Sequence, residues 1–259
     1  MKVGFKYSFS LSDSAVRDLY ARLWSRQIAL TDKEFYEWQF ISPPDNNFSD
    51  HCVVAVVDEC VVGVMGLNVR SFNLGGVNKR GAELTTWIVD PNFSGLGAGA
   101  KMLAFIQAEF EVLIGMGITD QALGIYMKMG FRFLGSIPRF LRVKDLEIVE
   151  KFGSVSKLGR QLIQKWQPQA SPSMIEREVE WSQESDIQSE FNGFDRSSKS
   201  LYWRYSCHPY FKYHSVSVED LGRRCVVIFR VESCGDFNIM RIIDILGHQN
   251  NYDLALKFI

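Results

Sequence analysis

The sequence predicts an α+β protein in which helices flank a mixed, mostly antiparallel central sheet, a three-layer α/β arrangement. Helix-like and strand-like segments alternate along the first half of the chain. Two β-rich runs, 52–57 and 60–69, are separated only by Asp58-Glu59, which is typical of a tight hairpin. The strand that ends at Val89 leads through a glycine-rich loop into a helix. A second, smaller α+β domain is predicted to follow.

Each element of the first half has its own signal. Apolar side chains recur at helical spacing after the capping candidates Ser12 and Asp13, and Pro43-Pro44 ends a second helix. The predicted strands are rich in Val, Ile, Thr and Trp. In chain order the predicted elements are helices 12–28 and 32–40, strands 52–57, 60–69 and 83–89, helix 101–110, strand 111–118, helix 120–129 and a bent strand over 131–143.

The second half is predicted to form its domain behind a linker. Residues 148–166 have a helical pattern of mixed charge, and Gln167 to Ser173 hold the prolines and serines that are typical of a connection. Strands are expected at 213–218, 224–231 and 238–246, before a helical segment over 251–259. The predicted division is a first domain over 1–147, a helix and linker over 148–175, and a second domain over 176–259.

Composition narrows the class of protein. The 259 residues carry 29 basic and 30 acidic side chains, so no basic stripe favours nucleic-acid binding. No apolar stretch approaches the ~20 residues of a membrane span, and the N-terminus lacks a signal-peptide pattern. The five cysteines form no CxxC pair, so neither a disulfide framework nor a metal site is expected. We therefore expect a cytoplasmic protein without a metal, and a homodimer is compatible with the sequence.

The glycine-rich loop is the most informative segment. Gly95, Gly97 and Gly99 precede a helix, and backbone N–H groups at a helix start bind phosphate groups well. A Walker loop does not fit, because Gly99 is followed by Ala100-Lys101-Met102. A dinucleotide-binding fingerprint does not fit either, because the spacing is G-x-G-x-G after several antiparallel strands. Plain turn chemistry remains the alternative for the loop alone.

The order of elements and two motifs resemble the GNAT superfamily of acyl-CoA N-acyltransferases. The family's Q/R-x-x-G-x-G/A loop falls on Ser94, Gly97 and Gly99. Its N-x-x-A-x-x-x-Y-x-x-x-G-F segment falls on 119–131, where Thr119 and Tyr126 take the asparagine and tyrosine positions. The resemblance covers roughly 5–143. Two departures, Ser94 and Thr119, weaken a contact to the pyrophosphate and put in doubt one near the pantetheine arm.

The resemblance implies a site for acetyl-CoA or another short acyl-CoA. The backbone of Ile88 and Val89 would bind the pantetheine arm and polarise the carbonyl, and Tyr126 would protonate the departing sulfur. The residues implied to bind the pyrophosphate are Ser94, Gly95, Leu96, Gly97, Ala98 and Gly99, and Thr119 is implied beside the pantetheine. Glu83 is the general-base candidate, with ordered water as the alternative. A core tyrosine and a solvated glutamate are the purely structural alternatives.

The second half resembles a degenerate second GNAT-like domain, and its loop 247–251 lacks the glycine alternation of a CoA site. A looser resemblance to acyltransferases of bacterial surface-polysaccharide biosynthesis implies an amino-sugar acceptor, with a nucleotide-linked amino sugar as one form of it. Tyr202, Arg204 and His208 are candidate acceptor residues, with packing between domains as the alternative. Transfer to a peptide or amino-acid amine, and a non-catalytic CoA-binding module, are the competing functions.

Overall fold

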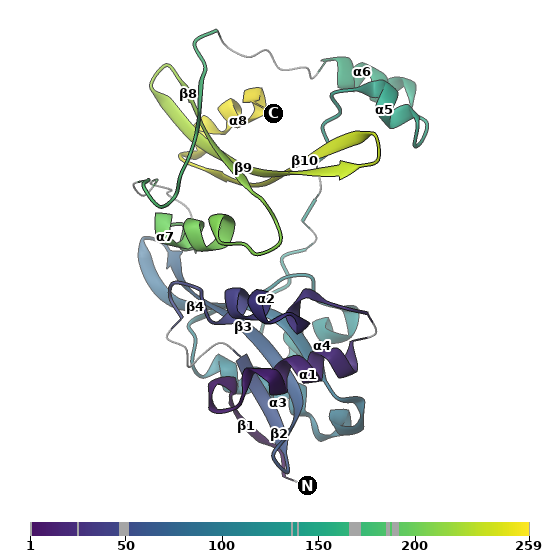
Figure 1. The fold of residues 1–259 in the computed structure, drawn as a ribbon, viewed down its shortest axis with the longest axis vertical. Helices are drawn as coiled ribbons and strands as arrows, with labels where there is room; N and C mark the ends of the chain where they lie inside the picture. Colours follow the sequence, from purple (N-terminus) through teal and green to yellow (C-terminus); the bar gives the residue numbers. More distant parts are fainter. Residues whose placement is uncertain are drawn as a thin grey trace. The chain divides into compact units, whose positions relative to one another are not determined.

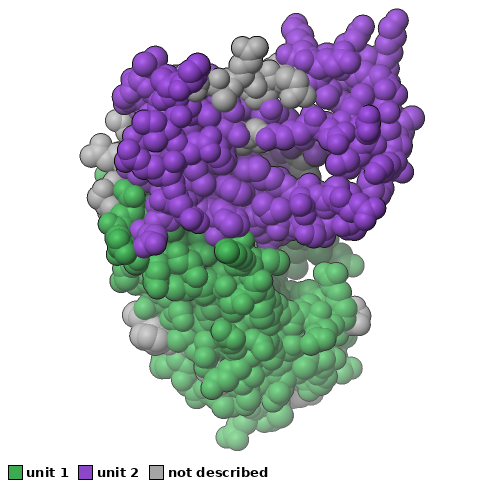
Figure 2. Space-filling view, turned by 45° about the horizontal axis from the view of Figure 1, so that its top comes forward, with its two compact units in different colours: residues 1–133, 181–186, 190–212 green, residues 134–180, 187–189, 213–259 purple. Residues whose placement is uncertain are grey.

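The computed structural model describes residues 2–24, 26–46, 52–135, 137–138, 140–165, 172–184, 187 and 192–258. The chain divides into two compact units, which Figure 2 colours separately. Unit 1 contains Met1–Phe133, Trp181–Asp186 and Glu190–Lys212. Unit 2 contains Leu134–Glu180, Ile187–Ser189 and Tyr213–Ile259.

Unit 1 is built on a mixed sheet in the strand order β1-β2-β3-β4-β5, with β7 paired to β3. Neighbouring strands are antiparallel except β4 and β5, which are parallel. The predicted hairpin between β2 and β3 is confirmed, and Asp58 and Glu59 both have positive φ as its tight turn requires. The strands are β1 (Gly4–Tyr7), β2 (Cys52–Val57), β3 (Cys60–Leu74), β4 (Val77–Val89), β5 (Val112–Gly115) and β7 (Gly193–Phe194).

Helices cover both faces of this sheet, as Figure 1 shows. On one face α1 (Asp13–Leu23) and α2 (Lys33–Phe40) bury Tyr20, Tyr36 and Phe40 against the sheet. On the other, α3 (Ala98–Gln107) and α4 (Asp120–Lys128) contribute to a second core. Alternate strand residues supply the two cores, as expected for a sheet buried on both sides. The predicted fold class is confirmed.

The strand β4 is distorted near the middle of the sheet. Leu84 pairs with Leu67 and Trp87 with Met65, so β4 holds one residue more than β3 over this stretch and forms a β-bulge. The parallel pairing with β5 covers only Gly81 to Leu84, whereas β4 continues to Val89. Past the bulge, the edge of β4 that faces β5 is therefore open.

The chain returns to unit 1 late in the sequence. After β7 come α7 (Ser198–Leu201) and one turn of π-helix, η4 (Tyr202–Ser206). Trp203 stacks on Trp38 of α2, and each indole Nε1 donates to the other residue's carbonyl, at 2.9 and 3.0 Å. This grouping differs from the predicted division, which placed every residue after 176 in the second domain. Order along the chain could not reveal that this segment packs on the first sheet.

The predicted bent strand over 131–143 is wrong for the residues that the structure describes there, none of which lies in a strand. Gly130, at φ +88°, ends α4, and Phe131 turns back onto Tyr126. Gly135 has φ +90° and Pro138 has no N–H to donate, so a regular strand is interrupted twice. Beyond these breaks Phe140 and Leu141 are open to solvent, at 92% and 82% exposed.

Unit 2 has its own antiparallel sheet, in the order β10-β9-β8-β6. Its core joins Val218, Cys225 and Val227 of the sheet to Leu254 and Ala255 of the last helix. The predicted helix over 148–166 is two helices, α5 and α6, and Trp166 lies outside the described residues. The elements are α5 (Leu146–Glu150), α6 (Lys157–Lys165), β6 (Ile175–Glu178), β8 (His214–Asp220), β9 (Arg223–Cys234), β10 (Phe237–Leu246) and α8 (Tyr252–Phe258).

Candidate functional site

The candidate site lies where β4 and β5 separate. Asp90 N–H donates to Val62 O of β3 at 2.8 Å. Hydrogen-bonded pairs recur every second residue of an antiparallel ladder, so Ile88 also bonds toward β3, opposite Val64. Trp87 and Val89 accordingly direct their N–H and C=O groups to the open edge. Of the two predicted backbone contacts, Val89 therefore lies on the open edge and Ile88 faces β3, and Trp87 shares the orientation of Val89.

Tyr126 of α4 lies at the end of β5. A Cβ built on Gly115, the last residue of β5, would stand 3.5 Å from the Tyr126 hydroxyl oxygen. The ring is buried edge-on between Trp87 and Phe131. Burial raises the pKa of Tyr126 to about 12. The phenol therefore stays protonated around neutrality and can act as a proton donor beside the open edge.

Glu83 lies at the same level of the sheet as Tyr126, but on the opposite face. Leu84 next to it belongs to the core that contains Tyr126, so alternation turns Glu83 toward the face of α2 and η4. It stands opposite Asn68 in the β3–β4 register. Its Oε2 lies 3.8 Å from Nη1 of Arg204, with side-chain exposures of 12% and 32%. Glu83 and Tyr126 thus flank the separation of β4 and β5 from opposite sides.

A second arginine lies beside this ion pair. Arg70 of β3 is 7% exposed, lies over the ring of Phe194 at 5.0 Å and donates from Nη2 to Asp195 O at 2.7 Å. Burial, together with the nearby charge of Arg204, lowers the pKa of Arg70 to about 10, while Glu83 acts in the opposite direction. Arg70 therefore remains charged around neutrality. The positive charges of Arg70 and Arg204 therefore lie near the Glu83 carboxylate on one face of the sheet.

The glycine-rich loop forms a 3₁₀ helix, Pro91–Leu96, that leads into α3. Gly97 lies at φ +67°, a left-handed conformation that suits glycine. The first hydrogen bond of α3 runs from Lys101 N to Gly97 O, so the preceding N–H groups of Ala98, Gly99 and Ala100 are those that a helix start offers to an anion. Leu96, at the end of the 3₁₀ helix, is exposed. The loop geometry suits a phosphate group.

The three glycines have different surroundings. A Cβ on Gly95 would meet nothing within 4 Å, which leaves the backbone there open to a ligand. A Cβ on Gly99 would come within 2.8 Å of Cζ2 of Trp87. Gly99 therefore lets α3 pack closely on β4, a role that the loop motif alone did not indicate.

Two of the predicted polar contacts serve local structure. The Ser94 hydroxyl donates to Pro91 O at 2.9 Å within the 3₁₀ helix. Thr119 caps α4, because its Oγ1 accepts from Ala122 N at 3.3 Å. Both residues lie at the positions where the motif predicts them, and both side chains are engaged by their own turns.

His208 and Arg204 come from the same segment, and only Arg204 reaches Glu83. The His208 ring packs on Trp38 with centroids 4.2 Å apart, and its Nδ1 accepts from Tyr210 N and Phe211 N, both at 3.1 Å. These contacts hold the turn that follows η4. Tyr202, by contrast, is 43% exposed.

Sequence reasoning missed Asn68, Arg70 and Trp87. Alternation along β3 puts Asn68 and Arg70 on one face, and the polar residues that follow its long apolar run were the available signal. Trp87 could be recognised only once the bulge was known.

The described residues include no cluster of three or more possible metal ligands and no helix long and apolar enough to cross a bilayer. A hollow of about 420 Å³ in unit 2, beside Phe152 and the 234–237 turn, contains none of the predicted site residues.

Comparison with known proteins agrees with this geometry. The model of the acetyltransferase (GNAT) family matches residues 14–131. No curated protein matches the sequence significantly. The structure is similar to a probable N-acyltransferase of Enterococcus faecalis V583, with a TM-score of 0.62, 12% identity and coverage of 100% of this chain and 62% of that one.

Two further structures are similar over nearly the whole chain. They are GCN5-related N-acetyltransferases from Kribbella flavida (TM-score 0.54, 13% identity) and Anabaena variabilis ATCC 29413 (TM-score 0.51, 12% identity). Each match covers 99% of this chain and 61% of the other. The chain thus spans about three fifths of the length of these three proteins. At such low identity the likeness shows the fold.

Proposed function

We propose, on the premise that residues 14–131 form an acetyltransferase domain of the GNAT family, that the protein transfers an acetyl or short acyl group from acyl-CoA to a primary amine. The observation that carries the proposal is the placement of Glu83 and Tyr126 on opposite faces of the sheet, at the level where β4 and β5 part. A proton acceptor and a proton donor then flank one opening in the sheet. Acyl transfer to an amine needs both.

Acyl-CoA supplies the thioester, and the chain supplies the groups that bind it and move protons. The start of α3 binds the pyrophosphate through its free N–H groups. The N–H of Val89 on the open edge of β4 binds the carbonyl oxygen as negative charge develops there. Glu83 accepts the proton that the amine loses as its nitrogen bonds to the carbonyl carbon, directly or through a water molecule. Tyr126 gives its phenolic proton to the sulfur as the carbon–sulfur bond breaks.

We assign the acceptor to the class of amino sugars, and a nucleotide-linked amino sugar is the favoured member. The support is the resemblance of the motifs to acyltransferases of surface-polysaccharide biosynthesis, together with the exposed ring of Tyr202, which is suited to stacking on a sugar. Tyr202 lies on the same π-helix as Arg204. An amino-acid or peptide amine is the second candidate, favoured by the arginine beside Glu83.

We further propose that unit 2 is a degenerate second copy of the same fold. Its strands β6, β8, β9 and β10 repeat the antiparallel order of β1 to β4. In β10, Ile242 pairs with Phe229 and Asp244 with Ile228, so Ile243 is an extra residue as in the bulge of β4. In each strand the pairing resumes two residues before the strand ends, at Asp244 here and at Trp87 in β4. A 3₁₀ turn and a helix then follow in both units.

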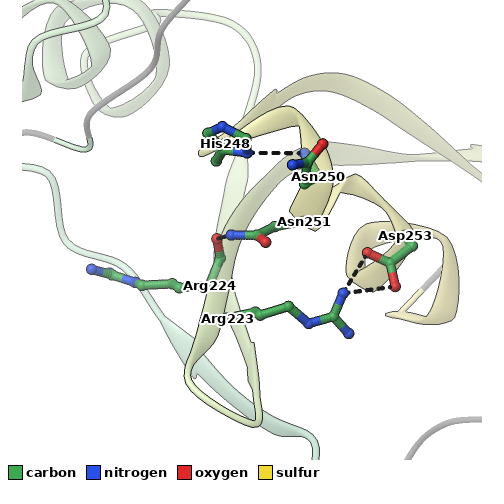
Figure 3. Close-up of polar contacts among 6 residues, drawn as sticks. All are labelled: Arg223, Arg224, His248, Asn250, Asn251 and Asp253. Atoms are coloured by element: carbon green, nitrogen blue, oxygen red, sulfur yellow. Dashed lines mark hydrogen bonds and ion pairs between the residues drawn. The ribbon is translucent and has the colours of Figure 1, made fainter.

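The turn after β10 differs from the glycine-rich loop in a way that supports a loss of CoA binding. A side chain of the turn is tied to β9, and β9 is tied to α8, as Figure 3 shows. Asn251 Nδ2 donates to Arg224 O at 3.0 Å, and Arg223 Nη1 binds both oxygens of Asp253 at 3.0 and 3.1 Å. His248 Nδ1 accepts from Asn250 N at 3.2 Å. In the turn after β10, side chains therefore fill the position at which the glycine-rich loop after β4 leaves its backbone accessible.

The test compares binding with turnover. Thermal shift with acetyl-CoA, free CoA and a dinucleotide measures binding, and thiol release with a panel of amines measures transfer. A ligand at a hundredfold excess over its Kd raises apparent stability by ~2.7 kcal/mol. We expect stabilisation by both CoA species and none by the dinucleotide. Absence of any CoA effect would refute the proposal.

Tyr126→Phe separates an enzyme from a non-catalytic CoA-binding module. We expect this variant to keep CoA binding and to lose turnover by about 100-fold, since it lacks the proton donor. Tyr252→Phe, a matched change on α8 of unit 2, should change neither. Equal turnover in the wild type and Tyr126→Phe would favour the module.

A further inference from the structure

Four charged residues meet on the face of unit 1 that carries Glu83: one ion pair, and Arg70, which donates to the backbone carbonyl of Asp195. Glu83 pairs with Arg204 at 3.8 Å. Arg70 lies beside Asp195, whose carboxylate accepts from the hydroxyls of Ser197 and Ser200 at 2.5 and 2.6 Å. Burial acts to raise the pKa of Asp195, but these hydrogen bonds outweigh it and hold the pKa below its ordinary value. The group is therefore neutral overall only while Glu83 is charged and engaged with Arg204.

The proposed reaction disturbs the ion pair. When Glu83 binds the ammonium form of an acceptor, or takes its proton, Arg204 loses its partner. Arg70 is close enough to repel Arg204, and Asp195 is already engaged with its serines. A cation left without a counter-charge in a largely buried place is costly. The structure thus favours an acceptor that brings a negative charge of its own.

The wall beside the ion pair also has unused polar atoms. Oδ1 of Asn68 and Nε of Arg70 are buried and have no hydrogen-bond partner among the described residues. They lie two residues apart on β3, on the same face as Glu83, and Asn68 stands opposite Glu83. Buried polar atoms of a folded protein normally have partners. One acceptor oxygen and one N–H donor beside Glu83 are therefore left without a hydrogen bond in the described part of this structure.

We propose that the acceptor is an amine that also carries an anionic group, a carboxylate or a phosphate, and that Arg204 binds this group while Glu83 receives the amine. The inference rests on the proposed function, because it names the substrate class of the same site. Arg204 suits the role because its planar guanidinium matches the geometry of both anions, and about a third of its side chain is open to solvent. A phosphate of a nucleotide-linked amino sugar and the carboxylate of an amino acid would both satisfy it.

The experiment uses matched pairs of amines. Glucosamine is compared with glucosamine 1-phosphate and glucosamine 6-phosphate, and tyramine is compared with tyrosine, each with acetyl-CoA and the full chain. We measure kcat/KM for the wild type, Arg204→Gln and Arg204→Lys. Arg26→Gln, an exposed arginine outside the site, is the control for loss of a charge. The two pairs distinguish a phosphate from a carboxylate as the source of the anion.

We expect the wild type to prefer the anionic member of at least one pair. Arg204→Gln should lower kcat/KM for that member by about 10- to 100-fold, the usual effect of losing a hydrogen bond to a charged group. It should leave the neutral member unchanged or improve it, since Glu83 is then unpaired. Arg204→Lys should retain part of the preference, and Arg26→Gln all of it. Thermal melting of each variant without substrate is the folding control.

Two results would overturn the inference. The first is a wild type that acetylates neutral and anionic members equally, and the second is an Arg204→Gln variant that loses activity on both alike. Failure of the proposed function has a different signature, namely no transfer to any amine. In that case calorimetric titration with glucosamine 6-phosphate decides. Binding that Arg204→Gln abolishes supports an anion site at Arg204, and equal binding or none contradicts it.

Discussion

Replacing Gly99 with alanine tests whether the glycines of the loop serve packing or ligand binding. The new Cβ would stand 2.8 Å from Cζ2 and 3.1 Å from Nε1 of Trp87, whereas carbon atoms in contact prefer about 3.5–4.0 Å. The indole is held on another side by the edge of Tyr126, with centroids 5.4 Å apart. Overpacking of this kind costs about 1–3 kcal/mol. Alanine recovers at most about 1 kcal/mol through its better helix propensity. We expect a net loss of roughly 1 kcal/mol.

The neighbouring glycines provide matched controls in the same loop. Gly97→Ala should cost about 1–2 kcal/mol for a different reason, because alanine must adopt φ +67°. Gly95→Ala meets no atom within 4 Å and has an ordinary φ, so its stability should stay within about 0.5 kcal/mol of the wild type. If the loop binds the pyrophosphate, Gly95→Ala should nevertheless weaken the binding of CoA, because its backbone can no longer be approached as closely.

Urea denaturation gives the stabilities and calorimetric titration with CoA gives the affinities. Stability and affinity for CoA should respond to different variants. Gly99→Ala should lower mainly the stability, and Gly95→Ala should lower only the affinity. If Gly95→Ala were the most destabilised of the three, the description of the loop would be refuted. If Gly99→Ala were as stable as the wild type, the contact with Trp87 would not constrain α3.

Three further predictions concern the cap of α4, the stacked tryptophans and the pH dependence of kcat. Thr119→Ala should cost about 1 kcal/mol in a urea melt by removing the cap of α4, and Thr119→Ser should restore it; equal stability of all three proteins would contradict the cap. Trp38→Phe and Trp203→Phe should each cost about 1–3 kcal/mol, because each removes one donor and leaves a carbonyl without its bond. Because the two indoles are stacked, the cost of the double variant should differ from the sum of the two, and a loss below about 0.5 kcal/mol in either single variant would argue against the contact. Burial raises the pKa of Tyr126 to about 12, and only the protonated phenol can donate its proton. Deprotonation of Tyr126 should therefore cause no loss of kcat up to pH 10.0, the ordinary pKa of tyrosine. A fall in kcat well below pH 10 that traces to Tyr126 would contradict its role as the proton donor.

Local signals predicted much of unit 1 correctly. The hairpin at Asp58-Glu59, the glycine-rich loop and the start of α4 at Asp120 each depend on a few adjacent residues, and each lies where the sequence predicts it. The same holds for Tyr126, since a helix of known start and spacing fixes which face its side chain takes. Such features need no knowledge of distant parts of the chain.

The features that the sequence did not reveal depend on contacts between distant residues. Arg204 and Glu83 are both predicted site residues, but nothing in the spacing of the sequence shows that a π-helix after residue 201 brings them within 3.8 Å. Hydrophobic periodicity also cannot distinguish a strand from an exposed extended segment, so 131–143 was predicted as a strand. Gly135 and Pro138 were the signals against it.

The position of Arg204 changes how the boundary of the catalytic unit should be drawn. A domain that ended near residue 147 would contain Glu83, Tyr126 and the loop, which is everything that the motifs indicate. It would lack β7, α7 and η4, and with them the cover over Trp38 and the partners of Arg70. The charge of Glu83 would then face solvent on a wall that is now polar and enclosed. In the proposed function, the late segment 192–208 therefore belongs to the acceptor side of the site, and we expect the choice among amines to depend on residues outside 14–131, the range that the family model matches.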